Sequence, residues 1–277
     1  MAVAVSVVAI LSQYFLPALY PSVIPVYQNL GARFLIGYLI PIVACFLLLG
    51  TGPLLRWRRE MPRAVVWGLG WYGALSLLAL VLGLIIIAFY AVFDPSALDL
   101  LNRPNPALVA AQSDPWFWVG ISFAIGIFEE LIFRGWIFGY WVQRGTDRWL
   151  VHATWTSALF AGVHLYYGFT YLAASPVAFV SLFLTGFAFA ATVWTTKGNL
   201  VVVAALHGAS DATAFLVLVN PTLGYALHYG LIGIGALVGL IAYLVLRPAP
   251  RAPPEMVFPL PPPAPSRPPE PPVAGGV

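Results

Sequence analysis

Seven residues in three short runs carry the chemistry that this sequence suggests. They are Glu129, Glu130 and Arg134, then Phe160 and His164, then His207 and Asp211. All three runs lie within long apolar stretches of the chain. An ionisable side chain inside an apolar span costs about 2.5–3.5 kcal/mol at the centre of a helix, so it needs a partner or a function.

The first run holds a potential ion pair and one spare carboxylate. Glu130 and Arg134 are four residues apart, so they share one helical face and can pair, which offsets the burial of both charges. Glu129 lies about 100° around the same helix and has no obvious partner within it. We therefore treat Glu130 and Arg134 as one unit and Glu129 as a separate, free carboxylate.

The other two runs repeat the four-residue spacing, in Phe160 to His164 and in His207 to Asp211. If the three helices converge, Glu129 meets two imidazoles and a second carboxylate. This set suits hydrolysis, because a carboxylate beside histidine can take a proton from water, and a second histidine can orient a developing oxyanion. Two histidines with carboxylates can also hold zinc with an open water position, which the sequence leaves open for these four ionisable residues.

Each signal also has a structural interpretation. A buried pair such as Glu130 and Arg134 is often only a packing device between helices. His152 and His228 also lie in apolar stretches, and we interpret both as packing residues. The single cysteine, Cys45, lies in another apolar run and is expected to pack there, so no internal disulfide is possible.

The composition indicates that lipid surrounds most of the chain. Of the 277 residues, 61% are hydrophobic and only 8% are charged, against about 25% charged in soluble domains. About 20 apolar residues suffice to cross a bilayer as a helix. We predict an all-α polytopic membrane protein of about eight transmembrane helices, within a domain of residues 1–246 whose motif-bearing core is 116–219. The apolar segments are 2–20, 33–50, 64–92, 116–142, 150–169, 174–195, 199–219 and 223–246.

Loop charges predict the orientation, because Lys and Arg collect in cytoplasmic loops. Every second loop is basic, which places both termini in the cytoplasm. The basic residues are Arg56, Arg58, Arg59, Arg63, Arg144, Arg148, Lys197, Arg247 and Arg251. Residues 247–277 hold about half of the 25 prolines, which is typical of a disordered or polyproline II tail, here cytoplasmic.

The three runs, in this order and on separate spans, resemble the CPBP family of intramembrane proteases. That family includes the type II CAAX prenyl endopeptidases and bacterial proteins linked to bacteriocin self-immunity. Its motifs stand here as Glu129-Glu130-x-x-x-Arg134, Phe160-x-x-x-His164 and His207-x-x-x-Asp211. The resemblance covers roughly residues 116–219.

The resemblance implies a role for each motif residue. Glu129 would activate water with help from His164, while His207 and the residue at position 211 would face the oxyanion. Glu130, Arg134 and Phe160 would support the site. Position 211 is Asp here, where the prenyl-protease members have Asn. Because Asp donates a hydrogen bond only when protonated, a role as water or metal ligand is also open there.

We therefore expect an intramembrane endopeptidase acting on a membrane-associated or lipidated peptide or protein, with lipid and substrate as partners and no nucleic acid. Zinc is a candidate cofactor, although a glutamate-activated water without metal fits the same residues. Two alternatives remain open: a proton-linked transporter, since carboxylate and histidine relays occur in such proteins, and a non-catalytic immunity or scaffold protein. The oligomeric state is not readable from the sequence.

Overall fold

The computed structural model describes residues 60–96, 115–139, 148–164 and 175–246, together with Val43, Leu47 and Val142. These residues form helices joined by turns, as the predicted all-α class requires. In chain order the elements are α6 (Met61–Phe93), α9 (Pro115–Glu130), the π-helix η3 (Leu131–Phe138), α11 (Trp149–Val163), α13 (Ser175–Thr195), α14 (Leu200–Ala212), the 3₁₀-helix η6 (Thr213–Leu218) and α15 (Pro221–Leu246).

The last six of the eight predicted segments coincide with these helices. Four described stretches are long and apolar enough to cross a membrane: Met61–Phe93, Trp116–Phe138, Leu200–Leu218 and Pro221–Leu246. The chain is therefore a multi-pass membrane protein. The segments 2–20 and 33–50 and the tail 247–277 lie outside the described residues apart from Val43 and Leu47, so the total of eight spans stays a prediction, as does the cytoplasmic placement of the termini.

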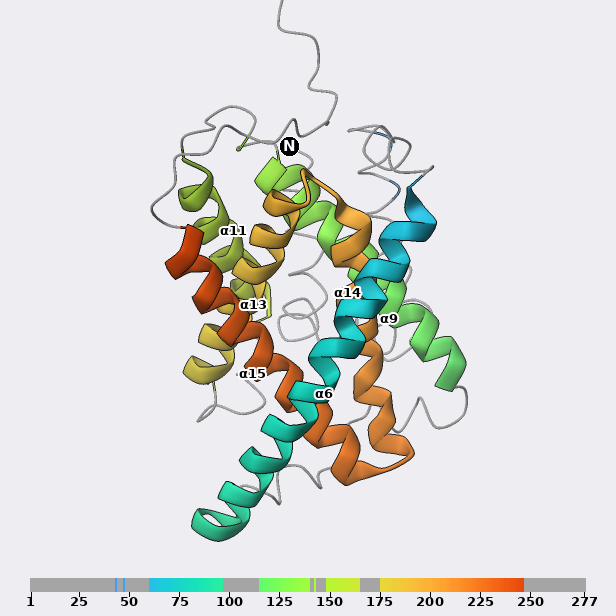
Figure 1. Cartoon of the computed structure of the whole chain (residues 1–277), viewed down its shortest axis with the longest axis vertical. Helices are drawn as coiled ribbons and strands as arrows, with labels where there is room; N and C mark the ends of the chain where they lie inside the picture. The colour runs from blue at the N-terminus through green and yellow to red at the C-terminus, as the bar shows by residue number, and fades with distance from the viewer. Residues whose placement is uncertain are drawn as a thin grey trace, which may run out of the picture.

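Figure 1 shows how the helices are arranged, and the spans differ in how much of each is buried. About half of the Trp116–Phe138 and Leu200–Leu218 spans is buried, at 50% and 56%, against 11% for α6 and 22% for α15. The element α14 packs against both α9 and α6, while α15 packs against α6 and α13, and α11 packs against α13. Thus α9, η3 and α14 form the inner part of the bundle, and α6 and α15 face the lipid.

The start of α14 is fixed by a tight turn. Lys197 and Gly198 adopt left-handed backbone angles, with φ of 57° and 88°, which reverse the chain after α13. The side-chain oxygen of Asn199 then accepts hydrogen bonds from the backbone N–H groups of Val201 and Val202, at 3.1 and 3.4 Å. This N-cap sets the register of α14, and with it the direction of the polar side chains that follow.

Two glycines bring α9 and α14 into backbone contact beside those side chains. A Cβ atom at Gly126 would lie 2.6 Å from the backbone nitrogen of Gly208, and one at Gly208 would lie 2.7 Å from the Cα atom of Phe123. Small residues at crossing points let membrane helices approach closely. The contact lies one turn before Glu130 on α9 and one residue after His207 on α14, so it brings these two side chains within reach.

Candidate active site

Arg134 is the anchor of the polar centre. Its Nη1 atom donates to Glu130 Oε1 at 2.9 Å, and its Nη2 atom donates to the backbone oxygen of Gly186 on α13 at 3.0 Å. Both charged residues are buried, with exposures of 1% for Arg134 and 0% for Glu130. The ion pair predicted from the four-residue spacing is confirmed, and it also ties η3 to α13.

The π-helix η3 begins directly after the two glutamates. At its end the backbone N–H of Gly139 donates to the carbonyl oxygen of Arg134, five residues earlier, which is the wide turn of a π-helix. Such turns are rare and often occur at functional sites. Here the wide turn lies within the motif region, where it holds the guanidinium of Arg134 against α13.

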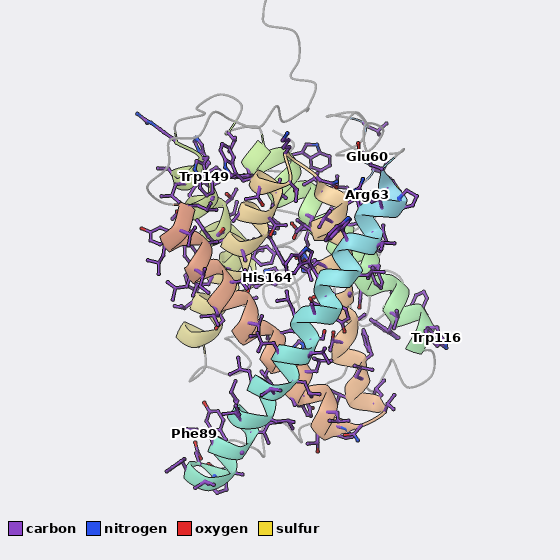
Figure 2. All side chains as sticks on the ribbon, in the orientation of Figure 1. Glu60, Arg63, Phe89, Trp116, Trp149 and His164 are labelled. Atoms are coloured by element: carbon purple, nitrogen blue, oxygen red, sulfur yellow. The ribbon has the colours of Figure 1, made fainter. Side chains whose placement is uncertain are left out.

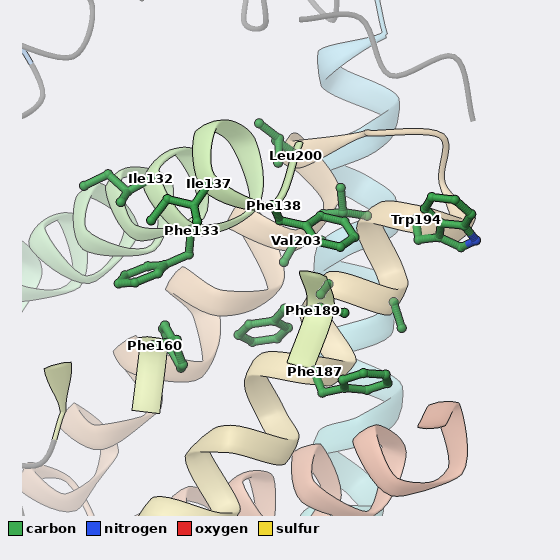
Figure 3. Packing of buried hydrophobic residues seen from close by; sticks show 14 of the residues in the cluster. Ile132, Phe133, Ile137, Phe138, Phe160, Phe187, Phe189, Trp194, Leu200 and Val203 are labelled. Atoms are coloured by element: carbon green, nitrogen blue, oxygen red, sulfur yellow. The ribbon is translucent and has the colours of Figure 1, made fainter. Parts of the chain in front are cut away.

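Three phenylalanine rings, which Figure 3 labels, lie around the same guanidinium. Its central carbon lies 4.3 Å from the ring centre of Phe160, 5.2 Å from that of Phe189 and 5.9 Å from that of Phe133. The rings of Phe133 and Phe160 meet edge to face at 5.3 Å. A cation over aromatic faces is stabilised by the ring quadrupoles, most strongly where water is excluded. Phe160 thus lies directly against Arg134, and its supporting role in the site stays a prediction.

Glu130 has a second partner, which lies on another helix and is therefore not predicted by the spacing of residues within one helix. His207 Nδ1 lies 2.8 Å from Glu130 Oε1, the same oxygen that accepts from Arg134. Because that oxygen is a carboxylate acceptor, Nδ1 of His207 carries the proton and donates it. The contact links residues 77 positions apart in the sequence, and a helical spacing rule reports only on neighbours within one helix.

Glu129 finds its partners on two other helices. Its Oε2 atom lies 3.6 Å from His164 Nε2 on α11 and 3.9 Å from His207 Nε2 on α14. The three side chains are nearly buried, at 8%, 12% and 8% exposed. These distances exceed a direct hydrogen bond, and they match a separation that one water molecule can bridge. The predicted convergence of the three motif helices is thereby observed.

His164 lies where α11 ends, and Figure 2 shows it in the middle of the bundle. Its Nδ1 atom is 2.7 Å from the backbone oxygen of Phe160, one turn earlier. A carbonyl oxygen can only accept, so Nδ1 carries the proton and Nε2 of the neutral ring presents a lone pair towards Glu129. The Phe160 to His164 spacing therefore fixes the tautomer of the histidine as well as its position.

Asp211 completes the cluster at its more accessible edge. Its Oδ2 atom lies 3.6 Å from His207 Nε2, and its side chain is 38% exposed. The i, i+4 relation on α14 predicted this proximity. Of the four candidate catalytic residues, Asp211 is the most exposed.

The other two histidines have separate surroundings. Trp155 Nε1 donates to His152 Nδ1 at 3.3 Å within α11, and His228 meets the ring of Tyr229 on α15. These contacts are of the packing kind that the sequence analysis assigned to both residues.

The donor set does not form a recognisable metal centre. Within the described parts of the chain, no group of three or more His, Cys, Asp or Glu side chains has the arrangement of metal ligands. Zinc bound by Glu129, His164, His207 and Asp211 stays a prediction.

The fold and this cluster define a class: a multi-pass helical membrane protein with carboxylates and imidazoles gathered inside the bundle. Residues 111–213 match the model of the family described as type II CAAX prenyl endopeptidase Rce1-like. This region includes all three motifs, and it is similar to that family. No curated protein and no solved structure gives a significant match to the chain.

Proposed function

We propose that the protein is an intramembrane endopeptidase that hydrolyses a peptide bond in a membrane-associated or lipidated peptide or protein. The observation that carries the proposal is the meeting of Glu129 with His164 and His207 from three separate helices, at distances that one water can bridge. The family match over the same residues supports peptide hydrolysis as the reaction.

A water between Glu129 and His164 is oriented for attack. Both Glu129 Oε2 and the lone pair of His164 Nε2 are acceptors, so the water directs one hydrogen to each of them. Its own lone pair then points away from both, towards an incoming carbonyl carbon. Glu129 takes a proton from the water as its oxygen forms a bond to that carbon.

The carbonyl oxygen becomes an oxyanion, and it needs a hydrogen-bond donor in a dry site. His207 Nδ1 is occupied by Glu130, so the donor must come from Nε2 of the doubly protonated ring or from the acid form of Asp211. Either source supplies one proton in the space between the two residues. The site is therefore active only when the His207 and Asp211 pair holds this extra proton.

The reaction closes with the proton that Glu129 accepted. Glu129 returns it to the nitrogen of the scissile bond, the carbon–nitrogen bond breaks, and an amine and a carboxylic acid leave. Arg134 takes no part in the proton transfers. It donates to Glu130 Oε1, the same oxygen that orients His207, and it fixes η3 against α13.

The decisive test is a comparison of protein termini in native membranes. New N- and C-termini are mapped by mass spectrometry in cells that contain wild type, Glu129→Gln or Asp94→Asn at matched expression. Asp94→Asn makes the same carboxylate-to-amide change at an exposed position beyond the end of α6. We expect termini that are present with wild type and Asp94→Asn and absent with Glu129→Gln, because the amide cannot accept the proton from water.

Equal termini in all three samples, with the proteins inserted and abundant, would refute proteolysis and favour the transport and scaffold alternatives. Elemental analysis of the same preparations tests the zinc prediction. Stoichiometric zinc in wild type that is lost in His164→Asn would replace the metal-free scheme by a metal-dependent one.

A further inference from the structure

A second site lies away from the polar centre, at the start of α6. A hollow of about 380 Å³ opens between the first three turns of α6 and the turn that joins α13 to α14. This volume falls in the range of roughly 300–1,000 Å³ that is usual for small-molecule sites. The hollow is lined by Glu60, Arg63, Ala64, Trp67, Trp71, Thr196, Asn199 and Val202.

One side of the hollow is a stripe of three large side chains. Arg63, Trp67 and Trp71 follow one another at four-residue intervals, so they lie along one face of α6. Trp67 and Trp71 are 55% and 54% exposed. Tryptophans of this kind are typical of the membrane–water interface, where their rings pack against lipid and their N–H groups reach polar partners.

The opposite side supplies polar groups. Thr196 donates its hydroxyl proton to the backbone oxygen of Thr192 and keeps its oxygen as an acceptor. The side-chain oxygen of Asn199 is used by the N-cap of α14, so its amide nitrogen is the part that can donate to a ligand. The exposed Lys197 is in the same turn. The wall thus adds an amide donor, and the turn that supplies it also carries a cation.

The charge balance of this end favours an anion. Figure 2 shows Glu60 and Arg63 at the same end of the bundle as Trp149, with Phe89 at the opposite end. Arg63 and Lys197 are exposed cations at this end, and Arg56, Arg58 and Arg59 stand shortly before Arg63 in the sequence. The one carboxylate in the hollow is Glu60, which is exposed. Basic pockets between membrane helices on the cytoplasmic side are suited to anionic lipid head groups.

We propose that this hollow, defined by the eight lining residues above, binds the head group of an anionic phospholipid. Its phosphate pairs with Arg63, and the two tryptophans pack along the glycerol and upper acyl chains. Leu78, 56% exposed and seven residues after Trp71 on the same face of α6, continues the apolar surface on which the acyl chains lie. A bound lipid would join α6 to the α13–α14 turn. The proposal does not depend on proteolysis.

The test uses the purified full chain and native mass spectrometry in mixtures of phosphatidylglycerol and phosphatidylcholine. Wild type should retain phosphatidylglycerol over phosphatidylcholine, and Arg63→Gln should reduce that preference by about fivefold, since one basic side chain contributes about that factor near an anionic surface. Arg148→Gln is the matched control, because Arg148 is an exposed arginine before the start of α11 and outside the hollow. It should leave the preference unchanged.

Two further measurements test whether the hollow recognises the lipid itself. Glu60→Gln should raise retention of phosphatidylglycerol, since it removes the carboxylate from the hollow. Inorganic phosphate at equal concentration should not displace the lipid, because the tryptophan contacts belong to the lipid alone. Thermal unfolding in the same mixtures should show a larger stabilisation by phosphatidylglycerol in wild type than in Arg63→Gln. Equal losses in Arg63→Gln and Arg148→Gln, or displacement by phosphate, would overturn the proposal.

Discussion

Two regions of this molecule pack in different ways within the lipid. In the polar centre, α9, η3, α11 and α14 bury large residues and charges, including Arg134 and Glu130. In the outer pair, α6 and α15, the buried residues of α6 are all small: Ala64, Gly68, Ala79 and Gly83. Ion pairs and hydrogen bonds between buried side chains hold the polar centre together. Close backbone contact between helices holds the outer pair together.

The difference shows what each region is for. In the outer pair, Cβ atoms at Gly83 and Gly230 would come within 1.7 and 1.8 Å of backbone oxygens on the opposite helix, so the contact is made by shape alone. In the polar centre, each charge costs energy to bury and is retained with several partners. Complementary shape is enough to hold two helices together as a scaffold. The energetic cost of burying charges in the polar centre is accounted for by the proposed chemistry.

The largest effect is expected from breaking the polar network at its anchor. Arg134→Met keeps the apolar volume but leaves the carboxylate of Glu130 in a fully buried position with His207 as its remaining partner. Breaking one side of a buried pair costs about 3–5 kcal/mol. We expect a large fall in the unfolding midpoint in detergent, and no cleavage, because His207 loses its orientation. Arg148→Met, at an exposed position, should change neither.

A smaller effect is expected in the outer pair. Gly83→Ala places a methyl group 1.7 Å from the backbone oxygen of Ala226, so α6 and α15 must separate, at a cost of about 1–3 kcal/mol. Gly70→Ala on the same helix has no atom within 4 Å of the new methyl group, so it should be neutral or slightly stabilising. Unfolding midpoints of the two variants measure the difference.

The comparison between regions also predicts that Gly83→Ala lowers stability while cleavage per folded molecule stays near that of wild type. A loss of activity equal to that of Arg134→Met, at full folding, would show that the outer pair takes part in the chemistry. Equal stability of Gly83→Ala and Gly70→Ala would show that the helices adjust freely, contrary to a contact made by shape.

Much of the polar centre was predictable because its signals are local. The pairing of Glu130 with Arg134 and the closeness of His207 to Asp211 follow from the helical period, and the structure has both. Charges in apolar runs are costly when isolated, which made convergence of the three motifs a condition of the expected site, and the structure meets it. The helix positions followed from the long apolar segments, within a few residues at each end.

The partners supplied by other helices were not predictable. The contact of His207 with Glu130 depends on the crossing of α9 and α14 at Gly126 and Gly208, and nothing in the spacing of residues reports a crossing point. Gly186 and Phe189 on α13 complete the surroundings of Arg134, yet they stand in an apolar helix like many other residues. Predicting these two contacts from the sequence would require knowledge of which face of α13 points into the bundle.

The smallest predicted effect concerns protonation in the polar centre. The proposed mechanism requires an extra proton on His207 or Asp211, so activity should be present while that proton is bound and be lost as pH rises. Asp211→Asn carries an amide N–H at every pH, since the amide does not titrate. We expect the variant to cleave at a rate near that of wild type at low pH and to lose less activity on the alkaline side.

The size of the difference follows from mass action. One pH unit above the midpoint of the alkaline fall, wild type retains about a tenth of its protonated form, so Asp211→Asn should exceed it by up to about tenfold there. The measurement is the pH profile of cleavage in sealed proteoliposomes with equal pH on both sides. Identical profiles would assign the titrating proton to another group. The outer pair of α6 and α15 offers a control, since Gly70→Ala adds no ionisable group and should reproduce the wild-type profile.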